Sequence, residues 1–139
     1  MGGYRSNDLT GDVDNRQKAE IQAWLRLQLD AAVQELMNNG VVENLLVEAK
    51  PAWVFPLQIL IGKIRAQGDS RQFRWFICGE VPTDHLDSTG ASTPREAARY
   101  FAMKWQLDAA RRQEGFDKQL ADKAEALYAL VDDTRLWPE

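Results

Sequence analysis

The residues of this chain that are best suited to chemistry are its only cysteine, Cys78, and its only histidine, His85. A nearby imidazole can convert a thiol into the thiolate that acts as a nucleophile. The pair is therefore the candidate catalytic site, and the enzyme it would form is a small hydrolase or transferase. The alternative stays open, because Cys78 ends an apolar strand pattern, where a buried and unreactive thiol is the commoner finding.

The stretch from Glu80 to Ser92 is predicted to be a loop. Polar groups on a loop that a rigid strand supports are typical of binding sites. The candidate ligand-binding or partner-binding residues in it are Glu80, Thr83, Asp84 and His85. In the alternative interpretation, Thr83 and Asp84 shape a turn and His85 tethers the loop to the helices by a hydrogen bond.

No metal or cofactor is expected. Asp84, His85 and Asp87 could offer ligands, but a metal site needs three or four converging groups, and their spacing is not diagnostic. The sequence contains no phosphate-binding glycine loop, zinc pattern or dinucleotide fingerprint.

The chain has five tryptophans, which is many for 139 residues. Most are expected in the core, because large aromatic side chains are highly buried on average. Trp53 and Trp137 lie near prolines at the ends of segments, and tryptophan is enriched at binding hot spots. These two residues are therefore candidates for a partner-binding surface.

The composition is that of a globular protein, with 45% hydrophobic residues, 27% charged residues and a net charge of −4. Basic residues exceed acidic ones in none of the segments 1–50, 51–93 and 94–139, so we expect no nucleic-acid partner. We also expect no membrane partner, since no apolar run approaches the length of a membrane span. The N-terminus does not resemble a signal peptide, and a single cysteine fits a reducing compartment, which predicts a cytoplasmic location.

The hydrophobic pattern predicts one α+β domain over residues 14–139, after a flexible tail over residues 1–13. A helix is expected from Asp14 to a stop at residues 38–40. An extended segment over residues 41–47 is closed by Lys50 and Pro51. A β-hairpin follows over about residues 57–78, with its turn at residues 67–70.

Two helices complete the pattern and are expected to pack on one face of a small, mainly antiparallel sheet. Thr93, Pro94 and Glu96 form a capping box at the start of the first helix. The apolar stripe of the second consists of Leu120, Ala124, Leu127 and Val131. Pro56 is expected to blunt one sheet edge, and Trp53 and Trp137 to cover another within the chain or across a two-fold interface, so we favour a homodimer.

Several short segments resemble a bacterial family of proteins of similar length. They are Gly79–His85, Arg95–Ala97, Trp105–Leu107, Ala124–Tyr128 and Leu136–Trp137. The resemblance covers about residues 15–137. The family is a domain of unknown function, so it implies no activity, and it adds weight only to the loop after Gly79.

Together these observations predict a cytoplasmic, non-enzymatic binding or adaptor domain for a protein or small-molecule partner. The alternative is an enzyme that uses Cys78 and His85. A buried Cys78 favours the binding domain, and a Cys78 with a depressed pKa in an open cleft favours the enzyme.

Overall fold

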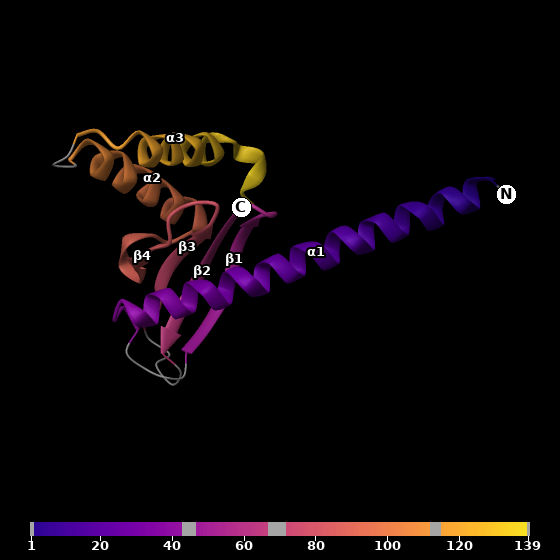
Figure 1. The fold of residues 1–139 in the computed structure, drawn as a ribbon, viewed down its shortest axis with the longest axis horizontal. Helices are drawn as coiled ribbons and strands as arrows, with labels where there is room; N and C mark the ends of the chain where they lie inside the picture. Colours follow the sequence, from indigo (N-terminus) through magenta and orange to yellow (C-terminus); the bar gives the residue numbers. More distant parts are fainter. Residues whose placement is uncertain (1, 43–46, 67–71, 112–114, 139) are drawn as a thin grey trace.

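The computed structural model describes residues 2–42, 47–66, 72–111 and 115–138, with side chains described from residue 14 onward. The chain forms three layers, with one long helix, a four-stranded sheet and a pair of helices (Figure 1). The elements are α1 (Gly2–Asn38), β1 (Val47–Phe55), β2 (Ile59–Ala66), β3 (Arg74–Gly79), β4 (Asp84–Asp87), α2 (Pro94–Ala110) and α3 (Lys118–Asp132). The predicted α+β fold is confirmed.

The sheet is antiparallel, with strand order β1-β2-β3-β4. The predicted hairpin is the β2–β3 pair, and its turn at residues 67–70 lies outside the described residues, as do residues 43–46 of the predicted extended segment. β1 does not stop at Pro51 as predicted but continues to Phe55, with a break in register between Pro51 and Trp53. An edge strand tolerates this proline, since its backbone need not donate to a second neighbour.

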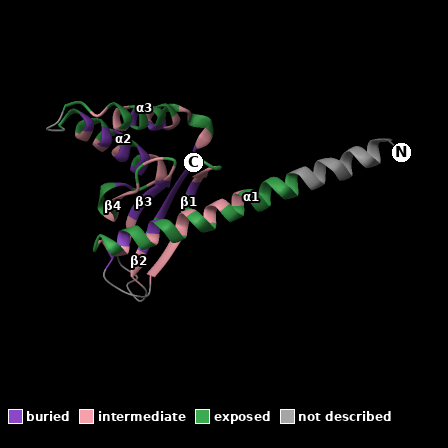
Figure 2. Cartoon of the chain, viewed as in Figure 1, coloured by how far each residue is buried: buried purple, intermediate pink, exposed green. Residues whose placement is uncertain are grey.

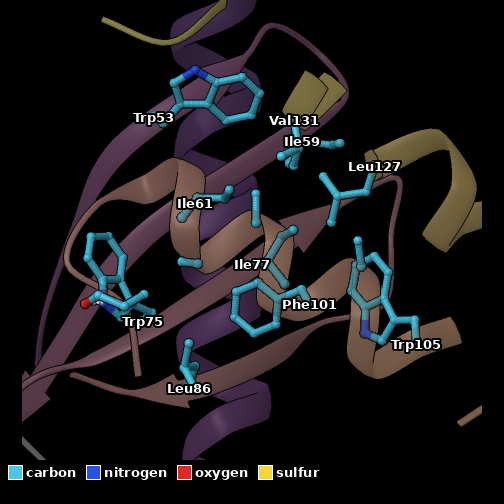
Figure 3. Packing of buried hydrophobic residues seen from close by; sticks show 14 of the residues in the cluster. Trp53, Ile59, Ile61, Trp75, Ile77, Leu86, Phe101, Trp105, Leu127 and Val131 are labelled. Atoms are coloured by element: carbon cyan, nitrogen blue, oxygen red, sulfur yellow. Dashed lines mark hydrogen bonds between the residues drawn. The ribbon is translucent and has the colours of Figure 1, made fainter. Parts of the chain in front are cut away.

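The two faces of the sheet carry separate hydrophobic clusters, because alternate residues of a strand point to opposite sides. On one face, the central strands pack against α2 and α3 (Figure 3). The labelled residues of this cluster are Trp53, Ile59, Ile61, Trp75, Ile77, Leu86, Phe101, Trp105, Leu127 and Val131. On the other face, Ala32 and Leu36 of α1 cover Leu60, Phe76 and Cys78. Both C-terminal helices therefore lie on one sheet face, as predicted.

The start of α2 follows the predicted capping box closely. Thr93 Oγ1 accepts a hydrogen bond from the Glu96 N–H at 3.1 Å. The Glu96 carboxylate reaches one residue further back than in the standard motif and accepts from the Ser92 N–H at 2.7 Å. The first bond satisfies a donor that the first helical turn would otherwise leave open, and the second satisfies the N–H of the residue just before the cap.

Helix α1 begins at Gly2 and not at Asp14, so the backbone of residues 2–13 is helical where the sequence predicted no regular structure. Residues 14–20 are all exposed, and the helix extends beyond the sheet toward the N-terminus (Figure 2). The flexibility of residues 1–13 in solution stays a prediction. None of the described helices has both the length and the apolar character needed to cross a membrane.

Candidate functional site

The segment predicted to be a loop contains an edge strand, β4. Its residues pair with β3, with His85 opposite Phe76 and Asp84 opposite Ile77. Neighbouring residues of a strand face opposite sides. Asp84 therefore faces α2, and His85 lies on the face that α1 covers. The loop prediction was wrong for residues 84–87 and for the short 3-10 helix Ser88–Gly90, and it holds for residues 80–83 and 91–92.

The loop after Gly79 is clamped at both sides. Gly79 has φ of 118°, and a Cβ atom at this position would lie 2.2 Å from the Gln58 carbonyl oxygen. Only glycine accepts this conformation and this close approach. The Glu80 N–H donates to Gln58 O at 2.7 Å, and Lys123 Nζ donates to Glu80 O at 2.7 Å. The loop is thereby held to the β1–β2 turn and to α3.

The Asp84 carboxylate joins β4 to α2. Its Oδ1 accepts from the His85 N–H at 2.8 Å and from Lys104 Nζ at 2.7 Å. Its Oδ2 accepts from Lys104 Nζ at 2.9 Å and from Trp105 Nε1 at 3.0 Å. Only 14% of the Asp84 side chain is exposed, and four hydrogen bonds use the acceptor capacity of a carboxylate. Asp84 therefore holds two layers of the fold together.

The His85 ring is bound to a neighbouring strand and not to a helix. Its Nδ1 accepts a hydrogen bond from Arg74 Nε on β3 at 3.1 Å. Burial lowers the pKa of His85, and the guanidinium of Arg74 and the ammonium of Lys104 lower it further against the opposing effect of Asp84. Each of these contributions except that of Asp84 favours the neutral imidazole, which can accept the bond from Arg74.

His85→Ala is expected to lower the free energy of unfolding by about 1 kcal/mol at neutral pH, because Arg74 loses its acceptor. The folded chain holds the His85 pKa below its ordinary value of 6.5, so the unfolded chain takes up the proton first as the pH falls. The stabilising contribution of the Arg74–His85 hydrogen bond is therefore complete above pH 6.5 and is lost as the pH falls toward the His85 pKa of the folded chain. Urea unfolding at about pH 7.5 and about pH 5.5 measures both effects.

His85→Gln is the matched control, since glutamine offers an oxygen to Arg74 but does not titrate. We expect it to retain more stability than the alanine variant and to lose less stability than the wild type between the two pH values. An equal acid loss in the wild type and in His85→Gln would contradict a lowered His85 pKa.

Cys78 is buried under α1. It belongs to the cluster with Leu36 and Phe76, and its Sγ lies 3.8 Å from the Gln28 carbonyl oxygen. Burial, with a smaller contribution from Glu35, raises the pKa of the thiol to about 12. No hydrogen bond joins Cys78 to His85 in the described part of the chain. The Cys78–His85 site therefore stays a prediction.

Trp53 and Trp137 lie against each other inside the chain. Their rings stack with centroids 4.0 Å apart and planes 13° apart, and both side chains are buried. Trp53 Nε1 donates to Leu136 O at 2.8 Å, and Trp137 Nε1 donates to Leu130 O at 2.9 Å. The stack fastens the C-terminal segment to β1, which leaves the facing ring surfaces closed to an outside partner.

Two of the open hollows on the described surface bear on function. One, of about 450 Å³, lies between the loop and α3 and is lined by Gly79, Glu80, Val81, Pro82, Asp117, Gln119, Leu120 and Lys123. The other, of about 260 Å³, lies on the sheet and is lined by Glu48, Lys50, Lys63, Arg65, Gln72 and Phe73. Of the predicted binding residues, only Glu80 lines either hollow.

One protein-family model matches residues 18–137. The chain belongs to that family, Domain of unknown function (DUF4826). The match confirms the predicted resemblance to a domain of unknown function, and it spans both hollows and the Trp53–Trp137 stack. No curated protein and no solved structure matches the chain.

In the part of the DUF4826 domain that the structure describes, no three histidine, cysteine or acidic side chains gather where they could hold a metal ion. The hollow on the sheet was not predicted from the sequence, because its charged residues are brought together by the pairing of β1 with β2, which the sequence did not predict. The one available signal was the alternation of Lys63 and Arg65 with apolar residues in the predicted hairpin.

Proposed function

We propose that the chain is a non-enzymatic binding domain for a protein or small-molecule partner. The observation that carries the proposal is the use of Asp84, His85 and Cys78 within the fold. Each has an internal partner or a buried position. A catalytic acid or base must contact its substrate while it is in the right protonation state. The internal contacts of these three residues work against that requirement.

The enzyme alternative needs a Cys78 thiolate beside a free imidazole. Burial raises the pKa of this thiol to about 12, which disfavours the thiolate at neutral pH. The Nδ1 atom of His85 already accepts a hydrogen bond from Arg74, so only the other ring nitrogen could act as the base. These observations support the binding domain over the hydrolase or transferase.

The two open hollows are the proposed contact surfaces. In the first, Glu80 and Lys123 both line the hollow, and hydrogen bonds hold the loop that carries Glu80 in place. In the second, three basic side chains lie on an exposed part of the sheet. A preformed surface loses little conformational entropy when it binds a ligand.

The charge of the chain, its single thiol and its sheet edges bear on its proposed location and partners. A cytoplasmic location suits its single free thiol, and a chain of net charge −4 is not expected to bind nucleic acid. A homodimer stays a prediction. Pairing through the sheet edges is disfavoured, since Pro51 and a register break interrupt β1 and Asp84 occupies the His85 N–H of β4.

The proposal is tested with p-nitrophenyl acetate, an activated ester that reports nucleophilic thiols. We expect the wild type, Cys78→Ser and His85→Ala to release p-nitrophenolate at the same rate, because the thiol is closed off. A rapid burst, stoichiometric with protein and lost in both variants, would establish the Cys78–His85 enzyme and reject the binding domain.

A further inference from the structure

Two lysines face each other across the β1–β2 pair. The register places Lys50 directly opposite Lys63, and both side chains are exposed. Like charges directly opposite on neighbouring strands destabilise a sheet. Within the described residues, no carboxylate forms an ion pair with either ammonium group. An anion placed between the two lysines would relieve this repulsion.

The next cross-strand pair is already neutral. Glu48 lies opposite Arg65, and Glu48 Oε2 accepts from Arg65 Nε at 2.8 Å and Nη2 at 2.7 Å. This pair fixes the adjoining part of both strands. Among the described residues, no such ion pair neutralises the charges of Lys50 and Lys63, although the net charge of the chain is −4.

An aromatic side chain forms the third part of the hollow. Lys63 Nζ lies 4.6 Å from the centroid of the Phe73 ring and 5.0 Å from that of Trp75. These contacts favour a fixed position for the ammonium. Phe73 also lines the hollow beside Lys50. Helices α2 and α3 lie over the other end of the sheet, so this end stays open (Figure 1).

We propose that this hollow binds the phosphate group of a small phosphate monoester. Such a group carries a charge of roughly −1.5 to −2 at neutral pH and three acceptor oxygens, so it can engage both ammonium groups, whereas a single carboxylate matches only one charge. The apolar part of the ligand lies against Phe73. The volume of about 260 Å³ is below the range of pockets for drug-sized ligands, which favours a small ligand.

The inference rests on the proposed binding function and is tested with phenyl phosphate at low ionic strength. We expect saturable shifts of the amide NMR signals of β1, β2 and β3 around Lys50, Lys63 and Phe73. Inorganic phosphate should bind at the same place but more weakly, because it has no ring to contact Phe73. Added salt should weaken both, since the lysines are exposed.

Matched variants separate this site from general charge attraction. Lys50→Glu is expected to weaken phenyl phosphate binding at least about tenfold and to raise the urea midpoint of the free protein, because an opposite-charge pair replaces a like-charge pair. Lys18→Glu makes the same charge change on the exposed part of α1 and should bind as the wild type does. Phe73→Ala should reduce phenyl phosphate binding to the level of inorganic phosphate.

Three results would overturn this site. They are an absence of saturable shifts, equal binding by the wild type and Lys50→Glu, and equal weakening by Lys50→Glu and Lys18→Glu. A lower urea midpoint of Lys50→Glu would contradict the repulsion from which the site is inferred. The proposed function fails by a different result, the ester burst, so the two failures are distinguishable.

Discussion

Trp137→Ala is expected to lower the free energy of unfolding by about 3 kcal/mol, the lower part of the range for removing a buried tryptophan. The variant loses the ring stacked on Trp53 and the hydrogen bond from Trp137 Nε1 to Leu130 O. It also exposes the Trp53 ring to water. The C-terminal segment can collapse partly into the space, which is why the lower part of the range applies. Urea unfolding measures the change.

Trp137→Phe is the matched control for this stack. Phenylalanine keeps an aromatic ring against Trp53 but has no N–H for Leu130 O, so we expect a loss of about 1 kcal/mol. Sedimentation of the same samples reports the state of association. Wild-type stability in Trp137→Ala would contradict the docking of the C-terminal segment. A folded variant that dissociates from a dimer would place Trp137 at an interface between chains.

The elements that sequence reasoning predicted well are those with strong local signals. The start of α2 needs only Thr93, Pro94 and Glu96, which act within one turn of helix. The β2–β3 hairpin follows from alternation in two neighbouring strands. The buried stripe of α3 at Ala124, Leu127 and Val131 follows from helical periodicity.

The elements that it missed have weak or distant signals. β4 is four residues long, and Leu86 is its one apolar residue, so alternation cannot be recognised. The helical backbone before Asp14 has no apolar period that would have predicted it. Residues 1–13 were therefore predicted to be a flexible tail.

Two pairs of residues that bear on function come together only in the folded chain. Trp53 and Trp137 lie far apart in sequence, and only folding stacks them. The Lys50–Lys63 pair depends on the β1–β2 register, which includes an irregularity between Pro51 and Trp53. A one-residue change of register turns a side chain to the other face, so residue types alone could not reveal this pair.

Asp84, His85 and Cys78 were predicted as candidate site residues, but their roles depend on contacts that only the structure shows. Asp84 and His85 are neighbours in β4, yet the sheet turns one toward Trp105 and the other toward Arg74. The same alternation buries Cys78 under α1. The strand turns Asp84 to the sheet face opposite that of His85 and Cys78, whereas a loop would have allowed all three to converge.

Alkylation of Cys78 by iodoacetamide, followed by mass spectrometry, tests whether this thiol belongs to the core or to an active site. At neutral pH we expect alkylation about a thousandfold slower in the native protein than in urea, because burial excludes the reagent and disfavours the thiolate. Native alkylation as fast as in urea, or faster, would contradict this expectation.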